Sequence, residues 1–105
     1  MIEETYQYAL TITDQQEADD TFEILVGYAL QAGKDRLEAE ILVRQNLGYL
    51  AGYHSNETRA RVERLFRCSH PIFGALLASG APTPEQAFAW GQKIGEDLRR
   101  RKEES

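Results

Sequence analysis

Apolar residues recur at steps of three and four along most of the chain, which is the spacing of one buried face of an α-helix. A first helix start is indicated at Thr13 and Asp14, which offer a cap just before an acidic turn. Beyond it, the apolar face comprises Phe22, Leu25, Val26, Ala29 and Leu30.

 Ile24 and Tyr28 widen this apolar arc, which predicts a helix that is covered on more than one side. Gly33 is expected to end the helix, because glycine readily takes the left-handed conformation after a last turn.

Caps and proline divide the middle of the chain into two further helices. One is expected from about Asp35 to Tyr53, and another from Glu57 to about Cys68, before Pro71. The predicted apolar positions are Leu37, Ile41, Leu42 and Leu50 in the first of these, and Val62, Leu65 and Phe66 in the second.

The last third of the chain is expected to hold two helices. A short one spans 72–77 and is closed by Gly80. The final helix has the clearest start in the chain, because Thr83 is a good cap and Pro84 occupies the first turn, where its missing N–H costs nothing. The predicted buried face of this final helix is Ala87, Gly91, Ile94 and Leu98.

The first dozen residues fit two patterns. An alternation typical of a strand is carried by Tyr6, Tyr8, Leu10 and Ile12, whereas Ile2, Tyr6 and Ala9 or Leu10 fit a helix. A lone strand has nothing to pair with inside a helical monomer, so we expect a short helix or an extended arm. The whole pattern predicts one all-α domain over residues 1–105, a compact irregular bundle of about five helices.

The amino-acid composition indicates the class of protein. The chain has 105 residues, of which 42% are hydrophobic and 28% charged, and these values are those of an ordinary globular domain. Its one cysteine fits a reducing compartment, and no apolar run approaches the ~18 residues that span a bilayer. We therefore expect a cytoplasmic protein that needs no membrane.

Charge is unevenly distributed along the chain. Residues 1–40 contain ten acids and two bases, a net charge of −8, and residues 41–105 contain seven acids and ten bases, a net charge of +3. Opposite signs favour folding the two halves together or pairing two chains head to tail. Arg61, Arg64 and Arg67 recur every three residues, but interleaved acids and a net charge of −5 argue against nucleic-acid binding. We expect these arginines, with Arg59 nearby, to pair with the acidic half.

The segment 46–74, NLGYLAGYHSNETRARVERLFRCSHPIFG, is the richest in unusual residues. It resembles small helical bacterial proteins of uncharacterised function that carry similar NLGYxAGY and HPIFG strings. The resemblance covers the middle third of the chain. It implies a shared small helical fold and no particular activity.

The same segment carries the residue types that bind metals or act as nucleophiles. Cys68, His70 and His54 are metal-ligand types, but their spacing is not the paired spacing of structural zinc sites. A Cys–His nucleophilic pair needs a cleft and an orienting partner as well. A buried Cys68 and a helix-capping His70 are the simpler interpretation. We therefore expect no metal, no cofactor and no catalytic residue.

Polar aromatic residues suggest a binding site instead. Asn46, Tyr49 and Tyr53 lie on one side of the expected helix 35–53, and His54 follows it. The polar tips of these residues could edge a small-ligand pocket that also includes Cys68 and His70. A hydrogen-bonded network within the core is the alternative.

Two pairs of glycines suggest close helix packing. Gly48 and Gly52 lie four apart in one expected helix, and Gly91 and Gly95 lie four apart in another. Glycine inside a helix costs about 0.5–1 kcal/mol relative to alanine, so close backbone approach is the natural reason for it. The pairs either pack on each other within one chain or meet their copies across a two-fold axis. We expect a homodimer with these glycines at its interface, acting as a non-catalytic interaction or regulatory module; a small-molecule or metal site in the segment from Tyr49 to His70 is the alternative.

Overall fold

The computed structural model describes residues 2–54, 57–66 and 84–104. Within these residues the chain is all-α. Its five helices are α1 (Ile2–Ala9), α2 (Gln15–Gln31), α3 (Arg36–Tyr53), α4 (Glu57–Phe66) and α6 (Pro84–Glu104). The expected helical bundle is confirmed, while the predicted helix at 72–77 and the cap at Thr83 lie outside the described residues.

Local signals place the helix ends. The Asp14 side chain accepts a hydrogen bond from the Glu17 amide at 2.9 Å, and Asp35 does the same for Glu38 at 2.8 Å. Each carboxylate satisfies an amide that the first turn leaves without a partner. At the far end of α2, Gly33 has a φ of 95°, which confirms it as the terminator.

The first residues form helix α1, not a strand. Ala9, Leu10 and Ile12 are buried in the core, whereas Tyr8 is half exposed. Tyr6 packs partly against the same core from the preceding turn. Helical spacing therefore decides this segment, and the alternating pattern was misleading.

Helix α3 is the centre of the bundle, because α2, α4 and α6 all pack against it. One hydrophobic core cluster contains residues of α1, α2, α3 and α4, together with Phe88 of α6. The confirmed core positions of α2 and α4 are Phe22, Leu25, Val26, Ala29, Val62, Leu65 and Phe66.

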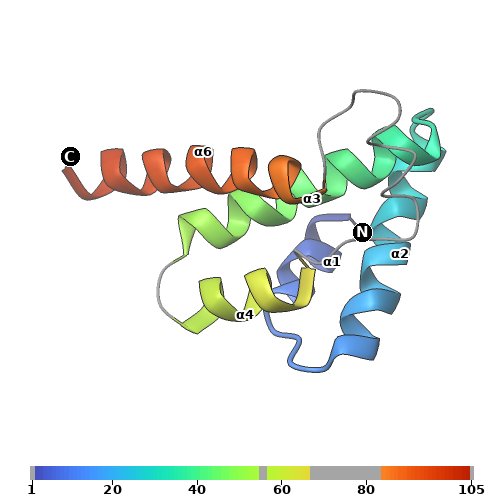
Figure 1. Ribbon diagram of the computed structural model, residues 1–105, viewed down its shortest axis with the longest axis horizontal. Coiled ribbons are helices and arrows are strands. Elements are labelled where there is room, and N and C mark those ends of the chain that lie inside the picture. The colour runs from blue at the N-terminus through green and yellow to red at the C-terminus, as the bar shows by residue number, and fades with distance from the viewer. Residues whose placement is uncertain (1, 55–56, 67–83, 105) are drawn as a thin grey trace.

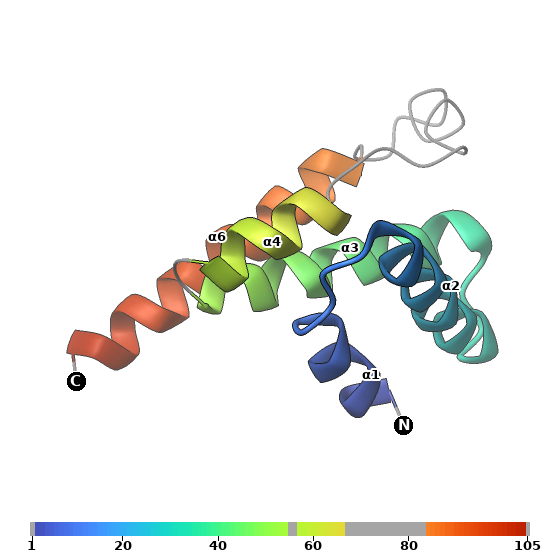
Figure 2. The same ribbon diagram turned by 90° about the horizontal axis from the view of Figure 1, so that it is seen from below.

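Helices α3 and α6 lie side by side in both views (Figures 1 and 2). Gly48 lies against the backbone of Phe88, and Gly52 lies against that of Gln92. The two residue numbers rise together, so the two helices run parallel. The last turns of α6 extend beyond the end of α3 (Figure 1).

Several predicted apolar positions are wrong. Ile24 and Leu30 of α2 and Leu42 of α3 are exposed, and so are Ile94 and Leu98 of α6. In α3 the buried face is instead made by two aliphatic residues, four small ones and two charged ones. The buried set of α3 is Ala39, Glu40, Val43, Arg44, Leu47, Gly48, Ala51 and Gly52.

The two buried charges of α3 form a network. Glu40 is fully buried and accepts from Arg36 Nε at 2.9 Å and from Arg44 Nη1 at 3.3 Å. The Arg44 guanidinium lies over the Phe22 ring, 4.3 Å from its centroid. A carboxylate buried this deeply needs such partners, since desolvation alone disfavours its charge. Glu40 is therefore a core residue.

Candidate functional site

In the part of the chain that the structure describes, two hollows open on either side of α3. The larger lies between α1 and α3 and has a volume of about 590 Å³. The smaller lies between α3 and α6 and has a volume of about 330 Å³. Asn46 and Tyr49 line both, so the hollows adjoin across α3. We call the two hollows together the α3 groove.

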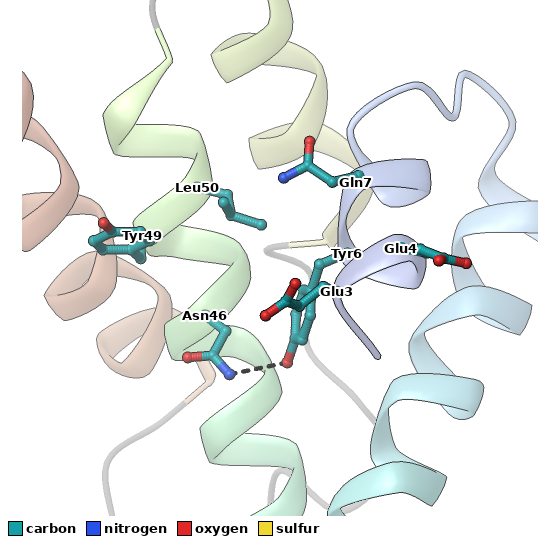
Figure 3. A pocket seen from close by; sticks show the side chains of 7 residues that line it. All are labelled: Glu3, Glu4, Tyr6, Gln7, Asn46, Tyr49 and Leu50. Carbon is teal, nitrogen blue, oxygen red and sulfur yellow. Dashed lines mark hydrogen bonds between the residues drawn. The ribbon is translucent and has the colours of Figure 1, made fainter. Parts of the chain in front are cut away.

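Figure 3 shows the larger hollow from close by. Its lining combines hydrocarbon and aromatic surface with carboxylates and amides. Leu50 and Asn46 face it from α3, and the Glu3 carboxylate is directed towards α3, whereas Glu4 points away (Figure 3). The described lining residues are Glu3, Glu4, Tyr6, Gln7, Asn46, Tyr49 and Leu50.

One hydrogen bond connects the two walls of this hollow. Asn46 Nδ2 donates to the Tyr6 hydroxyl oxygen at 3.0 Å (Figure 3). Burial raises the pKa of the Tyr6 phenol above its ordinary value of 10.0, and the bond from Asn46 opposes that rise. Tyr6 is therefore held as a neutral phenol that fixes α1 to α3.

Tyr49 and Tyr53 stack, as expected for two aromatic residues one turn apart. Their ring centroids are 6.5 Å apart, with an interplanar angle of 21°. The Tyr53 hydroxyl accepts from Lys102 Nζ at 3.0 Å, so this ring packs towards the end of α6. Tyr49 thus lines the α3 groove, while Tyr53 connects α3 to α6.

His54 follows the last residue of α3. Its ring meets Tyr53 edge-on, with centroids 6.1 Å apart, and its carbonyl oxygen accepts from Arg99 at 3.4 Å. Neither His54 nor Tyr53 is among the described lining residues of the two hollows. Of the six predicted ligand residues, the structure thus brings Asn46 and Tyr49 to the groove, while Cys68 and His70 lie outside the described residues.

A row of exposed apolar side chains borders the groove on α6. Trp90 is 56% exposed, Ile94 55% and Leu98 38%. Steps of four place these three on one strip of the helix. Trp90 and Ile94 also line the smaller hollow. We call Trp90, Ile94 and Leu98 the α6 row.

The opposite flank of α6 is covered by α4 through polar contacts. Arg59 pairs with Glu96 and lies 3.6 Å from Glu63, which also accepts from Gln92. Arg59 therefore pairs within the basic half of the chain, not with the acidic half as predicted. Arg61 does reach the acidic half, where it donates to the Leu10 carbonyl oxygen.

The four glycines lie between α3 and α6 of a single chain. A Cβ on Gly48 would stand 2.0 Å from the Phe88 carbonyl oxygen, and one on Gly91 would stand 1.9 Å from that of Gln45. Gly52 and Gly95 are in the same position, at 2.0 Å and 2.1 Å from such oxygens. The glycines therefore pack on each other within the monomer, which was one of the two expected arrangements. Contact of these glycines with a second copy stays a prediction.

The groove places hydrogen-bonding groups beside apolar and aromatic surface. Its described walls offer carboxylates, amides, phenols and hydrocarbon surface. No group of three or more side chains of His, Cys, Asp or Glu is placed to hold a metal ion in the described parts of the chain. None of the helices there is long and apolar enough to cross a membrane.

Sequence reasoning did not assign Tyr6 and Trp90 to a site. In the sequence, Tyr6 fits both the strand pattern and the helix pattern of the first dozen residues, and the helical spacing of the aromatic residues favours core packing for Trp90, which is instead 56% exposed. A useful signal was present for Trp90, because it continues at steps of four through Ile94 and Leu98. That apolar strip is distinct from the strip of Gly91 and Gly95, and one helix with two such strips has two contact surfaces.

Comparison with models of known protein families, with curated proteins and with solved structures found no match to this chain.

Proposed function

We propose that this chain is a non-catalytic interaction module that acts as a homodimer, with the α3 groove and the α6 row as its interface. The observation that carries the proposal is the exposure of Trp90 and Ile94 in neighbouring turns, at 56% and 55%. Monomeric proteins rarely leave large apolar residues exposed side by side. Indole surface of this kind is also what interfaces use most.

Burial of the α6 row in an interface would contribute a substantial free energy to association. A tryptophan side chain can bury about 150–250 Å², so covering the exposed part of Trp90 is worth about 2–3.5 kcal/mol at ~25 cal/mol per Å². Ile94 and Leu98 add to this on the same strip. Burial of the α6 row in a second molecule therefore supplies several kcal/mol towards association, before the entropy of association opposes it.

A second copy of the chain is the partner that the surface fits best. Each copy offers an apolar ridge on α6 and a groove beside it on α3, and a two-fold interface needs such a self-complementary patch. The net charges of −8 for residues 1–40 and +3 for residues 41–105 favour contact between unlike halves. We place this homodimer in the cytoplasm, because a chain with one cysteine needs no oxidising compartment.

Sedimentation of paired variants tests the proposal. Ile94→Glu puts a charge into the proposed interface, and Ile24→Glu is its control, because Ile24 is 53% exposed on α2. We expect wild type and Ile24→Glu to sediment as dimers at tens of micromolar, and Ile94→Glu as a monomer. Far-UV circular dichroism checks that each variant stays helical. A monomeric wild type at that concentration contradicts the proposal.

Binding of a small molecule is a second candidate function, favoured by one observation. The hollow between α1 and α3 has a volume of about 590 Å³, within the ~300–1,000 Å³ range of ligand pockets. Asn46 and Tyr49, expected from the sequence as ligand residues, both line it. Native mass spectrometry of the purified protein tests this function, because a retained compound adds a defined mass that Asn46→Ala loses.

A further inference from the structure

We propose that the hollow between α1 and α3 receives the indole of Trp90 from a second copy of the chain, twice in each dimer. This inference depends on the homodimer proposed above and names the contact that anchors it. Each of the two sites in the dimer then consists of the hollow of one copy and the Trp90 side chain of the other.

The arrangement follows from where the two hollows lie. They share Asn46 and Tyr49, so they stand at the same level along α3, on its two sides. Trp90 borders the hollow on the α6 side. A two-fold axis parallel to α3, in the plane of the interface, places the α6 side of one copy opposite the α1 side of the other. This rotation does not change the position of a residue along α3. It therefore brings the partner's Trp90 over the hollow on the α1 side, and the reverse contact forms at the same time.

The lining of the hollow suits an indole. Leu50 and the tyrosines offer apolar and aromatic surface to the ring, and the volume of about 590 Å³ admits a large side chain. An indole also carries one N–H donor, which needs an acceptor when it is buried. The Glu3 carboxylate, directed towards α3 in Figure 3, is such an acceptor.

Charge favours the same orientation. Lys93 lies one turn after Trp90 and is exposed. When Trp90 enters the partner's hollow, Lys93 of the same helix approaches the α1 wall, which carries Glu3. The alternative two-fold axis, across α3 instead of along it, pairs α6 with α6, and at the level of Lys93 it would bring two Lys93 side chains together. The axis along α3 is therefore the one that places unlike charges in contact.

Fluorescence reports the contact directly, because Trp90 is the only tryptophan in the chain. In the monomer this residue is 56% exposed, so we expect long-wavelength emission and ready quenching by acrylamide. In the dimer the emission should shift to shorter wavelength, and quenching should fall. The emission of the wild type is recorded at concentrations above and below its dissociation constant for dimerisation. The Ile94→Glu variant gives the emission of the monomer.

The outcomes separate this inference from the proposed dimer. If sedimentation shows a dimer whose Trp90 emission equals that of the monomer, the dimer stands and the indole contact is wrong. If wild type is a monomer at tens of micromolar, both are wrong. In support, Trp90→Ala should weaken dimerisation by at least about 30-fold, the usual loss at an interface anchor.

A charge exchange tests the axis. Glu3→Lys and Lys93→Glu each turn two attractive contacts per dimer into repulsive ones, so each variant alone should dimerise about tenfold more weakly. Mixed in equal amounts they form a heterodimer in which every such contact is attractive again, and affinity should return towards that of wild type. Both residues are exposed, so folding is not at stake. A mixture no stronger than either variant alone overturns the inference, and so does a dimer that responds to Lys93→Glu but not to Glu3→Lys.

Discussion

Replacement of single glycines by alanine is the sharpest test of how α3 and α6 pack. At Gly91 a new Cβ would stand 1.9 Å from the Gln45 carbonyl oxygen and 2.8 Å from the Tyr49 amide nitrogen. Both atoms belong to backbone, so no side chain can rotate to make room. Gly27 in α2 is a matched control inside another helix, because a Cβ there meets nothing within 4 Å.

Gly91→Ala and Gly27→Ala are expected to change the free energy of unfolding in opposite directions. Ordinary contact begins near 3.4 Å, so Gly91→Ala requires α3 and α6 to separate by about 1.5 Å. Overpacking of this kind costs about 1–3 kcal/mol and occasionally more, and movement of a whole helix favours the upper end. Better helix propensity returns about 0.5–1 kcal/mol, which leaves a net loss of about 2 kcal/mol. Gly27→Ala keeps only the propensity gain and should stabilise by about 0.5–1 kcal/mol.

Urea unfolding followed by circular dichroism measures both variants. The midpoint should fall for Gly91→Ala and rise for Gly27→Ala, with the slope unchanged. The double variant of Gly48→Ala and Gly91→Ala should cost less than the two single losses added together, since one separation of the helices accommodates both methyl groups. A Gly91→Ala protein as stable as Gly27→Ala would refute the close approach of the two helices.

Three further substitutions test the core and the groove. Glu40→Ala should lower the free energy of unfolding by about 3–5 kcal/mol in urea, because it leaves the Arg44 charge buried without its carboxylate, which lies at 3.3 Å. Phe66→Ala should cost about 3–5 kcal/mol in the same assay, since the ring is buried in the core. The Tyr6 pKa, raised by burial, predicts that the native state keeps a proton that the unfolded state loses near pH 10.0. Stability should therefore decrease as the pH rises above that value, and Tyr6→Phe should reduce this dependence in thermal melts between about pH 9 and about pH 11.

Helix ends were predictable because their causes are local. A carboxylate at Asp14 or Asp35 reaches an amide three residues later whatever surrounds it. Gly33 ends α2 because of its own backbone conformation. Such features require only neighbouring residues in the chain, so the sequence contains all that is needed to find them.

Buried faces and the groove were less predictable because they depend on which helix approaches from which side. Leu42 has the same spacing as a core residue but lies on the open side of α3. Ile94 was assigned to one face with Gly91, yet contact through the glycines leaves it exposed. Asn46 and Tyr49 were found as a polar pair on one helix, whereas their neighbour Tyr6 is 40 residues from Asn46 in the sequence.

The parallel contact of α3 and α6 explains why a surface of this kind is left open. Glycines let the two backbones meet directly, so large side chains of α6 are displaced to its flanks, and Trp90 and Ile94 stand on one of them. Because the helices run parallel, the chain must return along the pair between the end of α3 and the start of α6. Helix α4 makes part of that return and covers the other flank through Arg59 and Glu96. The close packing of the glycines and the exposure of the α6 row therefore have the same origin, and the dimer proposed above would cover the flank that α4 does not.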